Sequence, residues 1–288
     1  MKSNYRYIVK AFMAMAVIAG TTSCDDFLDR EPMSSISPET YYSTAAQLEA
    51  NLNDEYPNVL PSFGQWTYGI FGEDKGTDNQ IEVNANDRYT QDRWKVPHSE
   101  SDNWKFERIY RINFFLSEAL PKFGEDMSGS QNTISGSVAT IKHYIGEMYF
   151  LRAYEYFKKL QLFGDFPIIN QPLADEMEAL REASKRFPRN EVARFIISDL
   201  DKAYAYMSDV DMATTRINKD VAMLVKSRVA LFEATWLQNF KGTAFVPGGE
   251  GWPGASLHNN YQYPSGNIDN EVKYFLEQAV EASKLVAD

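Results

Sequence analysis

The sequence predicts a mostly α-helical protein in which long irregular loops separate the helices. First, the segment 138–163 contains no proline and carries apolar residues on nearly every side, as a helix buried among other helices does. Second, segments on either side of it repeat apolar residues every three or four positions. Third, two stretches, 58–103 and 242–267, lack this spacing and are rich in Gly, Pro, Asn and aromatic residues.

Composition and charge limit the class of protein. The chain has 288 residues, of which 44% are hydrophobic and 24% charged, as in an ordinary globular protein of one or two domains. Its formal net charge is −11. Phosphate recognition needs a basic surface, so we expect no nucleic-acid partner.

The residues 1–23 are predicted to be a secretory signal peptide. Lys2, Arg6 and Lys10 precede an apolar run at 11–19 that is too short to cross a bilayer as a mature helix. Small residues follow that run and lead to a cysteine. This order of basic, apolar and small residues is typical of an exported protein.

Cys24 is predicted to be the site of lipid attachment. It is the only cysteine of the chain, so it cannot form an internal disulfide, and the residues before it resemble a lipobox. The alternative is a free thiol beside an ordinary cleavage site. Two acyl chains would anchor the protein stably to a membrane. Residues 24–40 would then form a lipidated tether ahead of one helical domain at 41–288.

Two helices are expected before the long central one. Thr44 and Gln47 have the spacing of a capping box, and apolar residues continue from there at helical spacing until Pro57. A second helix is expected to begin with Asp102, or the serine before it, as its cap, and to include Trp104. A polar linker then leads to the central helix.

The central helix, 138–163, is expected to pack closely against a neighbour. Gly146 costs about 1 kcal/mol inside a helix, and its use would be to let another helix approach. Gly164 is expected to end the helix in a left-handed conformation, and Pro167 to prevent its resumption.

Three segments follow the central helix. The charged segment 173–189 is expected to be a surface excursion. Asn190 is expected to cap the next helix, and another helix is predicted at 221–240. After the second irregular stretch, Asp269 is expected to cap a last helix.

The two irregular stretches are the predicted ligand-binding region. Sugar recognition uses flat aromatic faces against pyranose C–H groups and fixed Asp, Asn or Arg groups for the hydroxyls. Both stretches supply these residue types, and the alternative is that the aromatic residues pin the loops to the core. The predicted ligand-binding residues are Asp78, Arg88, Tyr89, Trp94 and Trp252.

Several ordered motifs resemble the SusD/RagB family, outer-membrane nutrient-binding lipoproteins of the Bacteroidota. The central helix and the turn after it carry the main signature, and the neighbouring helices carry shorter ones. The matching residues are Gly146-Glu147, Phe150-Leu151-Arg152-Ala153-Tyr154, Phe157, Leu162-Phe163-Gly164-Asp165-Phe166-Pro167, Ile109-Tyr110-Arg111-Ile112-Asn113, Ile196-Ile197 with Asp199-Leu200 and Ala203, and Arg216-Ile217-Asn218.

The resemblance implies a fold and a function. The fold would be a SusD-like scaffold of tetratricopeptide-type helix pairs, and the protein would be lipid-anchored in the outer membrane and exposed at the cell surface. It would bind an oligosaccharide or other oligomeric nutrient without cleaving it, and pass it to a TonB-dependent SusC-like transporter. Family members are generally longer, so the chain resembles their N-terminal half.

Enzyme signatures are not found in the sequence. His98, His143 and His258 lack metal-ligand spacing, so we expect no metal, and no cofactor motif is present. Glu147 and Asp165 are expected to be buried partners of arginine or of backbone amides rather than a catalytic pair. Two alternatives stay open, a surface glycoside hydrolase and a structural helical-repeat adaptor that binds no sugar.

Overall fold

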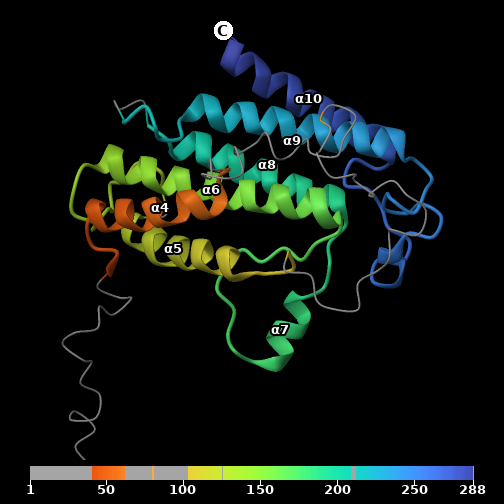
Figure 1. Ribbon diagram of the computed structural model, residues 1–288, viewed down its shortest axis with the longest axis horizontal. Helices are drawn as coiled ribbons and strands as arrows, with labels where there is room; N and C mark the ends of the chain where they lie inside the picture. Colours follow the sequence, from red (N-terminus) through yellow and green to blue (C-terminus); the bar gives the residue numbers. More distant parts are fainter. Residues whose placement is uncertain (1–40, 62–79, 81–102, 125, 209–211, 288) are drawn as a thin grey trace, which may run out of the picture. The chain divides into compact units, whose positions relative to one another are not determined.

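The structure is a computed structural model, shown in Figure 1. The chain divides into two compact units, Met1–Tyr41 and Tyr42–Asp288, and every described helix lies in the second. The residues that the structure describes are 41–61, 80, 103–124, 126–208 and 212–287.

The described residues form seven α-helices and one short 3₁₀ helix, with no β-strand among them. The predicted mostly α-helical fold is therefore confirmed. The elements are α4 (Ala45–Val59), α5 (Glu107–Phe123), α6 (Val138–Phe163), α7 (Met177–Ala183), α8 (Arg189–Tyr206), α9 (Lys219–Asn239), η3 (Pro253–Ser256) and α10 (Ile268–Ala287).

In the bundle of α4, α5, α6, α8, α9 and α10, each helix runs antiparallel to the next, so that α4 runs parallel to α6 (Figure 1). Helix α6 contacts α4 and α5 on one side and α8 on the other, while α8 packs on α9 and α9 on α10. Most of the residues of α6 are buried, in agreement with its apolar residues on all sides. The bundle therefore consists of successive antiparallel helix pairs, as expected.

Gly146 lies where α6 and α8 approach most closely. A Cβ atom at this position would lie 2.8 Å from the backbone nitrogen of Met207 and 2.9 Å from the carbonyl oxygen of Ala203. Only glycine fits such a distance between backbones. The predicted role of Gly146 is confirmed.

The ends of α4 and α6 agree in part with their predicted signals. Thr44 and Gln47 form the capping box, because each side chain accepts a hydrogen bond from the other residue's backbone N–H. Pro57 does not end α4, which continues to Val59. Gly164 ends α6 with a positive φ of 67°, but its ψ of −100° differs from the left-handed helical value that was expected.

The expected position of Trp104 inside a helix is wrong. Helix α5 begins only at Glu107, and its N-cap residue Phe106 makes no side-chain capping bond. Trp104 instead packs ahead of the helix, with ring centroids 4.8 Å from Phe163 and 4.9 Å from Phe166. The position of Trp104 is thus set by aromatic contacts with the end of α6 and not by membership of a helix.

The expected cap of α8 is also wrong. The helix starts two residues earlier than expected, with Pro188 at the N-cap and no side-chain capping bond. Asn190 is buried, and its amide donates to the Tyr261 hydroxyl at 2.9 Å and to Glu271 Oε1 at 3.1 Å. Because these tertiary contacts occupy the side-chain amide of Asn190, that side chain does not cap the helix.

Helix α10 begins one residue before Asp269, the residue that was expected to cap it. The side chain of Asn267 accepts the backbone N–H of Asn270 at 2.9 Å and so fills the capping role. Asp269 instead pairs with Lys241 at 2.5 Å.

The charged segment between α6 and α8 is a surface excursion, as predicted. Its helix α7 has no buried residue, and Met177 at its start is 82% exposed. In Figure 1, α7 lies apart from the other helices. None of the described helices combines the length and the apolar character that spanning a bilayer requires.

Candidate functional site

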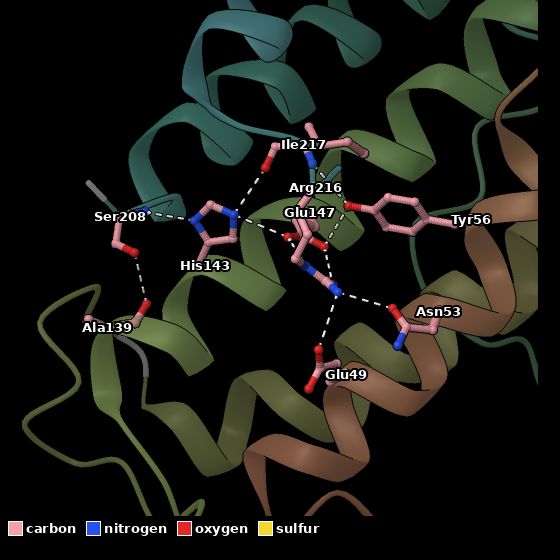
Figure 2. Close-up of polar contacts among 9 residues, drawn as sticks. All are labelled: Glu49, Asn53, Tyr56, Ala139, His143, Glu147, Ser208, Arg216 and Ile217. Atoms are coloured by element: carbon pink, nitrogen blue, oxygen red, sulfur yellow. Dashed lines mark hydrogen bonds and ion pairs between the residues drawn. The ribbon is translucent and has the colours of Figure 1, made fainter. Parts of the chain in front are cut away.

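The first polar cluster that could carry chemistry surrounds Glu147, in the middle of α6 (Figure 2). This carboxylate is fully buried. Arg216 donates to it through two nitrogens, at 2.8 Å from Nε to Oε1 and at 2.6 Å from Nη2 to Oε2. The Tyr56 hydroxyl donates to Oε2 at 2.8 Å. Both oxygens therefore have charged or hydroxyl partners.

His143 closes the other side of the Glu147 cluster (Figure 2). Its Nδ1 accepts the backbone N–H of Ser208 at 3.4 Å, so Nε2 carries the proton. Nε2 lies 3.0 Å from the carbonyl oxygen of Ile217 and 3.1 Å from Glu147 Oε1. The imidazole is buried and oriented from both nitrogens.

The Glu147 cluster connects three parts of the scaffold. Arg216 also contacts Glu49 and Asn53 of α4, at 3.5 and 3.0 Å. Burial and the nearby charge of Glu147 raise the pKa of Tyr56, so its hydroxyl stays a neutral donor. The cluster joins α4 and α6 to the segment before α9.

The other candidate carboxylate is the half-buried Asp165, just after α6. Its Oδ1 accepts the backbone N–H of Arg189 at 2.9 Å, and its Oδ2 accepts the indole N–H of Trp252 at 2.7 Å. Burial raises the pKa of Asp165, against the opposing effect of these two hydrogen bonds. The expectation that Glu147 and Asp165 are partners of arginine or backbone amides is confirmed.

Arg189 links Asp165 to α9. Its guanidinium donates to Glu233 through Nε at 3.0 Å and through Nη2 at 2.9 Å. It also lies over the ring of Trp236, 4.1 Å from the centroid. Burial raises the pKa of Glu233, although the charge and hydrogen bonds of Arg189 oppose the shift. The ion pair is almost entirely buried.

The far end of the irregular stretch 242–267 is held by Glu271 of α10. Its carboxylate accepts from Arg194 at 2.7 and 2.9 Å and from the backbone N–H of Ser265 at 3.1 Å. Burial opposes its ionisation, but the hydrogen bonds from Arg194, Asn190 and Ser265 outweigh that effect and lower its pKa. The half-buried Asp165 and the buried Glu271 therefore fix this stretch to the helices at two points.

One predicted ligand-binding residue can be placed, and its geometry contradicts the expectation. Trp252 is only 5% exposed, and its indole N–H is used by Asp165. Its ring packs against His258 and Tyr261, with centroids 5.9 and 5.6 Å away. The alternative, that this aromatic residue pins the loop to the core, describes the structure. The other predicted site residues, Cys24, Asp78, Arg88, Tyr89 and Trp94, lie outside the described residues.

Phe245 is the aromatic residue of the stretch 242–267 that faces outward. It is 61% exposed, in contrast to Trp252. The sequence does not show which of the two residues is exposed, because both lie among Gly and Pro. The residue that binds Trp252 on its inner side, Asp165, is 87 residues away in the chain. The glycines on both sides of Phe245 were the one available signal of a turn that could display it.

A separate recess of about 280 Å³ lies beside α5 and α7. Most of its lining is apolar, so it offers few partners to sugar hydroxyls. Its lining residues are Phe106, Ile109, Tyr110, Ile169, Gln171, Leu173, Leu180 and Ser184. Within the described part of the chain, no group of three or more His, Cys, Asp or Glu side chains could hold a metal ion.

Comparisons with known proteins all point to the same family. The model of a SusD-like family, described as "Starch-binding associating with outer membrane", matches residues 26–231. One SusD-like protein of Formosa agariphila is 25% identical over 253 residues, 84% of this chain and 46% of the relative. A second from the same organism is 25% identical over 233 residues, 74% of this chain and 41% of the relative.

Among solved structures, a SusD-like carbohydrate-binding protein from Bacteroides vulgatus is 16% identical, with a TM-score of 0.45. That likeness covers 80% of this chain and 50% of the other. The chain thus spans less than half the length of the two curated relatives.

Proposed function

The chain belongs to this SusD-like family, and on that premise we propose that it captures an oligosaccharide at the outer surface of the cell without cleaving it. The observation that carries the proposal is the attachment of the irregular stretch 242–267 to the helices. Buried contacts of Asp165 and Glu271 hold it at two points. A loop held in place before the ligand arrives loses less conformational entropy on binding.

The proposal assigns recognition to the irregular loops and support to the helices. The first loop, 58–103, would contribute Asp78, Arg88, Tyr89 and Trp94, whose residue types suit a sugar's C–H face and hydroxyls. The buried polar clusters of the bundle would hold the ends of the loops in fixed positions relative to one another. The family's description, which names starch, favours a carbohydrate over a peptide as the ligand.

A binding role without catalysis fits the two carboxylates that were the strongest catalytic candidates. Glu147 is closed off by Arg216 and Tyr56, and Asp165 by Arg189 and Trp252. Glycoside hydrolysis needs a pair of carboxyl groups that both reach the scissile bond. Both oxygens of each of these groups already accept hydrogen bonds from the protein.

The protein would act next to a partner in the outer membrane. Lipid attachment at Cys24 would hold it at the membrane, and a SusC-like TonB-dependent transporter would receive the captured oligosaccharide. Weak binding would suffice, because tethering beside the transporter raises the effective concentration of the captured ligand. The rivals are a surface glycoside hydrolase and an adaptor that binds the transporter but no sugar.

A glycan-panel binding assay, with a product assay on each hit, tests the proposal. The purified protein is compared with Trp94→Ala, and Tyr110→Ala serves as the control because Tyr110 is a 51% exposed aromatic residue on helix α5. We expect binding without product, loss of binding in Trp94→Ala and retention in Tyr110→Ala. Turnover of the glycan would favour the hydrolase, and a folded protein that binds no glycan would favour the adaptor.

A further inference from the structure

The turn after α9 displays one aromatic ring to solvent. Phe245 is 61% exposed, whereas Trp252, seven positions later in the same loop, is 5% exposed. Exposing a large aromatic side chain gives up the free energy of its burial, about 1.5–3 kcal/mol. A ring that serves only to pin the loop would point inward, as Trp252 does.

The backbone of this turn is fixed. Thr243 donates its N–H to the carbonyl oxygen of Phe240 at 3.0 Å, and Glu250 donates to that of Gly242 at 3.2 Å. At Gly249 a Cβ atom would lie 1.9 Å from the carbonyl oxygen of Thr243, so only glycine allows this approach. The turn therefore holds the backbone of Phe245 in place.

Aromatic contacts also support Phe245 from below. Its ring meets Phe240 edge-on at 5.4 Å, and Phe240 packs on Trp236 at 4.5 Å. The Trp236 indole N–H donates to the carbonyl oxygen of Phe245 at 3.0 Å. Trp236 is itself covered by Arg189, whose charge is paired with Glu233. The exposed ring thus rests on a chain of contacts that reaches the buried core.

The same turn and the start of α10 carry exposed polar side chains. Lys241, in the same turn, forms an exposed ion pair with Asp269, with Nζ 2.5 and 2.7 Å from the two carboxylate oxygens. Thr243 and Glu250 are also exposed. An exposed aromatic face in a segment that also carries charged and hydroxyl side chains supplies the groups that suit the two surfaces of a sugar, its C–H face and its hydroxyl rim.

We propose that Phe245 is a sugar-stacking residue that receives the C–H face of a neutral pyranose, with Lys241 and Asp269 available to its hydroxyl groups. This inference rests on the proposed function. The preferred sugars are those with equatorial hydroxyls, such as glucosides, because their ring faces carry C–H groups. One ring among polar side chains is too small an apolar area for a stable protein interface.

Binding of the best glycan of the panel to Phe245→Ala, measured by titration calorimetry, tests the inference. Losing the buried ring contact should weaken binding on the order of tenfold to a hundredfold. Phe245→Trp should keep the affinity, since it keeps a flat aromatic face. Leu257→Ala is the matched control, because Leu257 is a 53% exposed apolar residue of the same loop, and it should bind as the unchanged protein does.

The outcomes separate this inference from the proposed function. Unchanged affinity of Phe245→Ala, with a loss in Trp94→Ala, would contradict the stacking role of Phe245 and leave glycan capture intact. A folded wild-type protein without glycan binding would contradict both. An equal loss in Phe245→Ala and Leu257→Ala would also contradict the inference, because it would show a general disturbance of the loop.

Discussion

Two carboxylates, the buried Glu147 and the half-buried Asp165, hold different parts of the molecule by different means. Glu147 joins helices to one another, and a bidentate ion pair with Arg216 balances its charge. Asp165 joins the end of α6 to an irregular loop and accepts only uncharged donors, the Trp252 indole and a backbone N–H. An arginine side chain thus donates directly to the carboxylate of the helix contact, whereas the side chains of Arg189 and Arg186 act on the carboxylate of the loop contact only through their charge.

The difference predicts how each region fails. Removing one member of a buried ion pair leaves an uncompensated charge and costs about 3–5 kcal/mol. Removing a neutral donor leaves a buried acceptor without a partner and costs about 1–3 kcal/mol. We therefore expect that removing one charge destabilises the helical bundle strongly. Detaching the loop should cost less free energy of unfolding.

The largest expected effect is that of Glu147→Gln. It leaves Arg216 without its main counter-charge, and we expect a loss of about 3–5 kcal/mol in the free energy of unfolding, measured with urea. Glu49→Gln is the control, because Glu49 is 44% exposed and lies 3.5 Å from the same arginine. It should change stability by less than about 1 kcal/mol. Equal effects of the two variants would contradict the account.

A smaller effect is expected for Trp252→Phe. The variant removes the donor to buried Asp165 Oδ2, and we expect a loss of about 1–3 kcal/mol. Hydrogen exchange should rise mainly in 242–267. Trp236→Phe removes an indole donor to the exposed carbonyl group of Phe245 and is the matched control. A stability loss spread evenly over α6 and α8 would show that Trp252 belongs to the bundle rather than to the loop attachment.

The smallest expected effect is on the pH dependence of stability, where the two ends of the loop differ in sign. The pKa of Asp165 is raised from its usual value of 3.8, so its contribution to stability is greatest below that value and is lost as the pH rises through the raised pKa. The pKa of Glu271 is lowered from 4.5, so its contribution is present above 4.5 and is lost as the pH falls through the lowered pKa.

Urea unfolding of Asp165→Asn and Glu271→Gln over a series of pH values tests these signs. Relative to the unchanged protein, Asp165→Asn should gain stability as the pH rises above 3.8, and Glu271→Gln should lose stability as the pH rises to 4.5, with no further change above that value. Parallel pH profiles for both variants would contradict the assigned shifts.

Features that depend on local rules were predictable from the sequence. The capping box of Thr44 and Gln47 needs only residues three apart, and Gly146 marks a close contact within a helix of bulky residues. The motifs around α6 also indicated the family. Local rules failed where distant partners decide the outcome: Asn190 has the chemistry of a cap, but its amide is bound to Tyr261 and Glu271, 71 and 81 residues away.

The same reason explains the exchange of roles between two aromatic residues of one loop. Trp252 was expected to face the ligand, but it faces Asp165, which lies 87 residues earlier in the chain. Phe245 meets Phe240 on one edge and is otherwise exposed. Spacing and composition cannot distinguish the two residues, because the contact that buries Trp252 exists only in the folded protein.

Hydrogen exchange of the purified protein with and without its best glycan tests the central claim most directly, that the loops bind and the helices support. We predict slower exchange at 240–252 and within the first loop, 58–103, with no change in α6 and α8. Slower exchange confined to α6 and α8, or unchanged exchange at 240–252 in a protein saturated with glycan, would contradict the account.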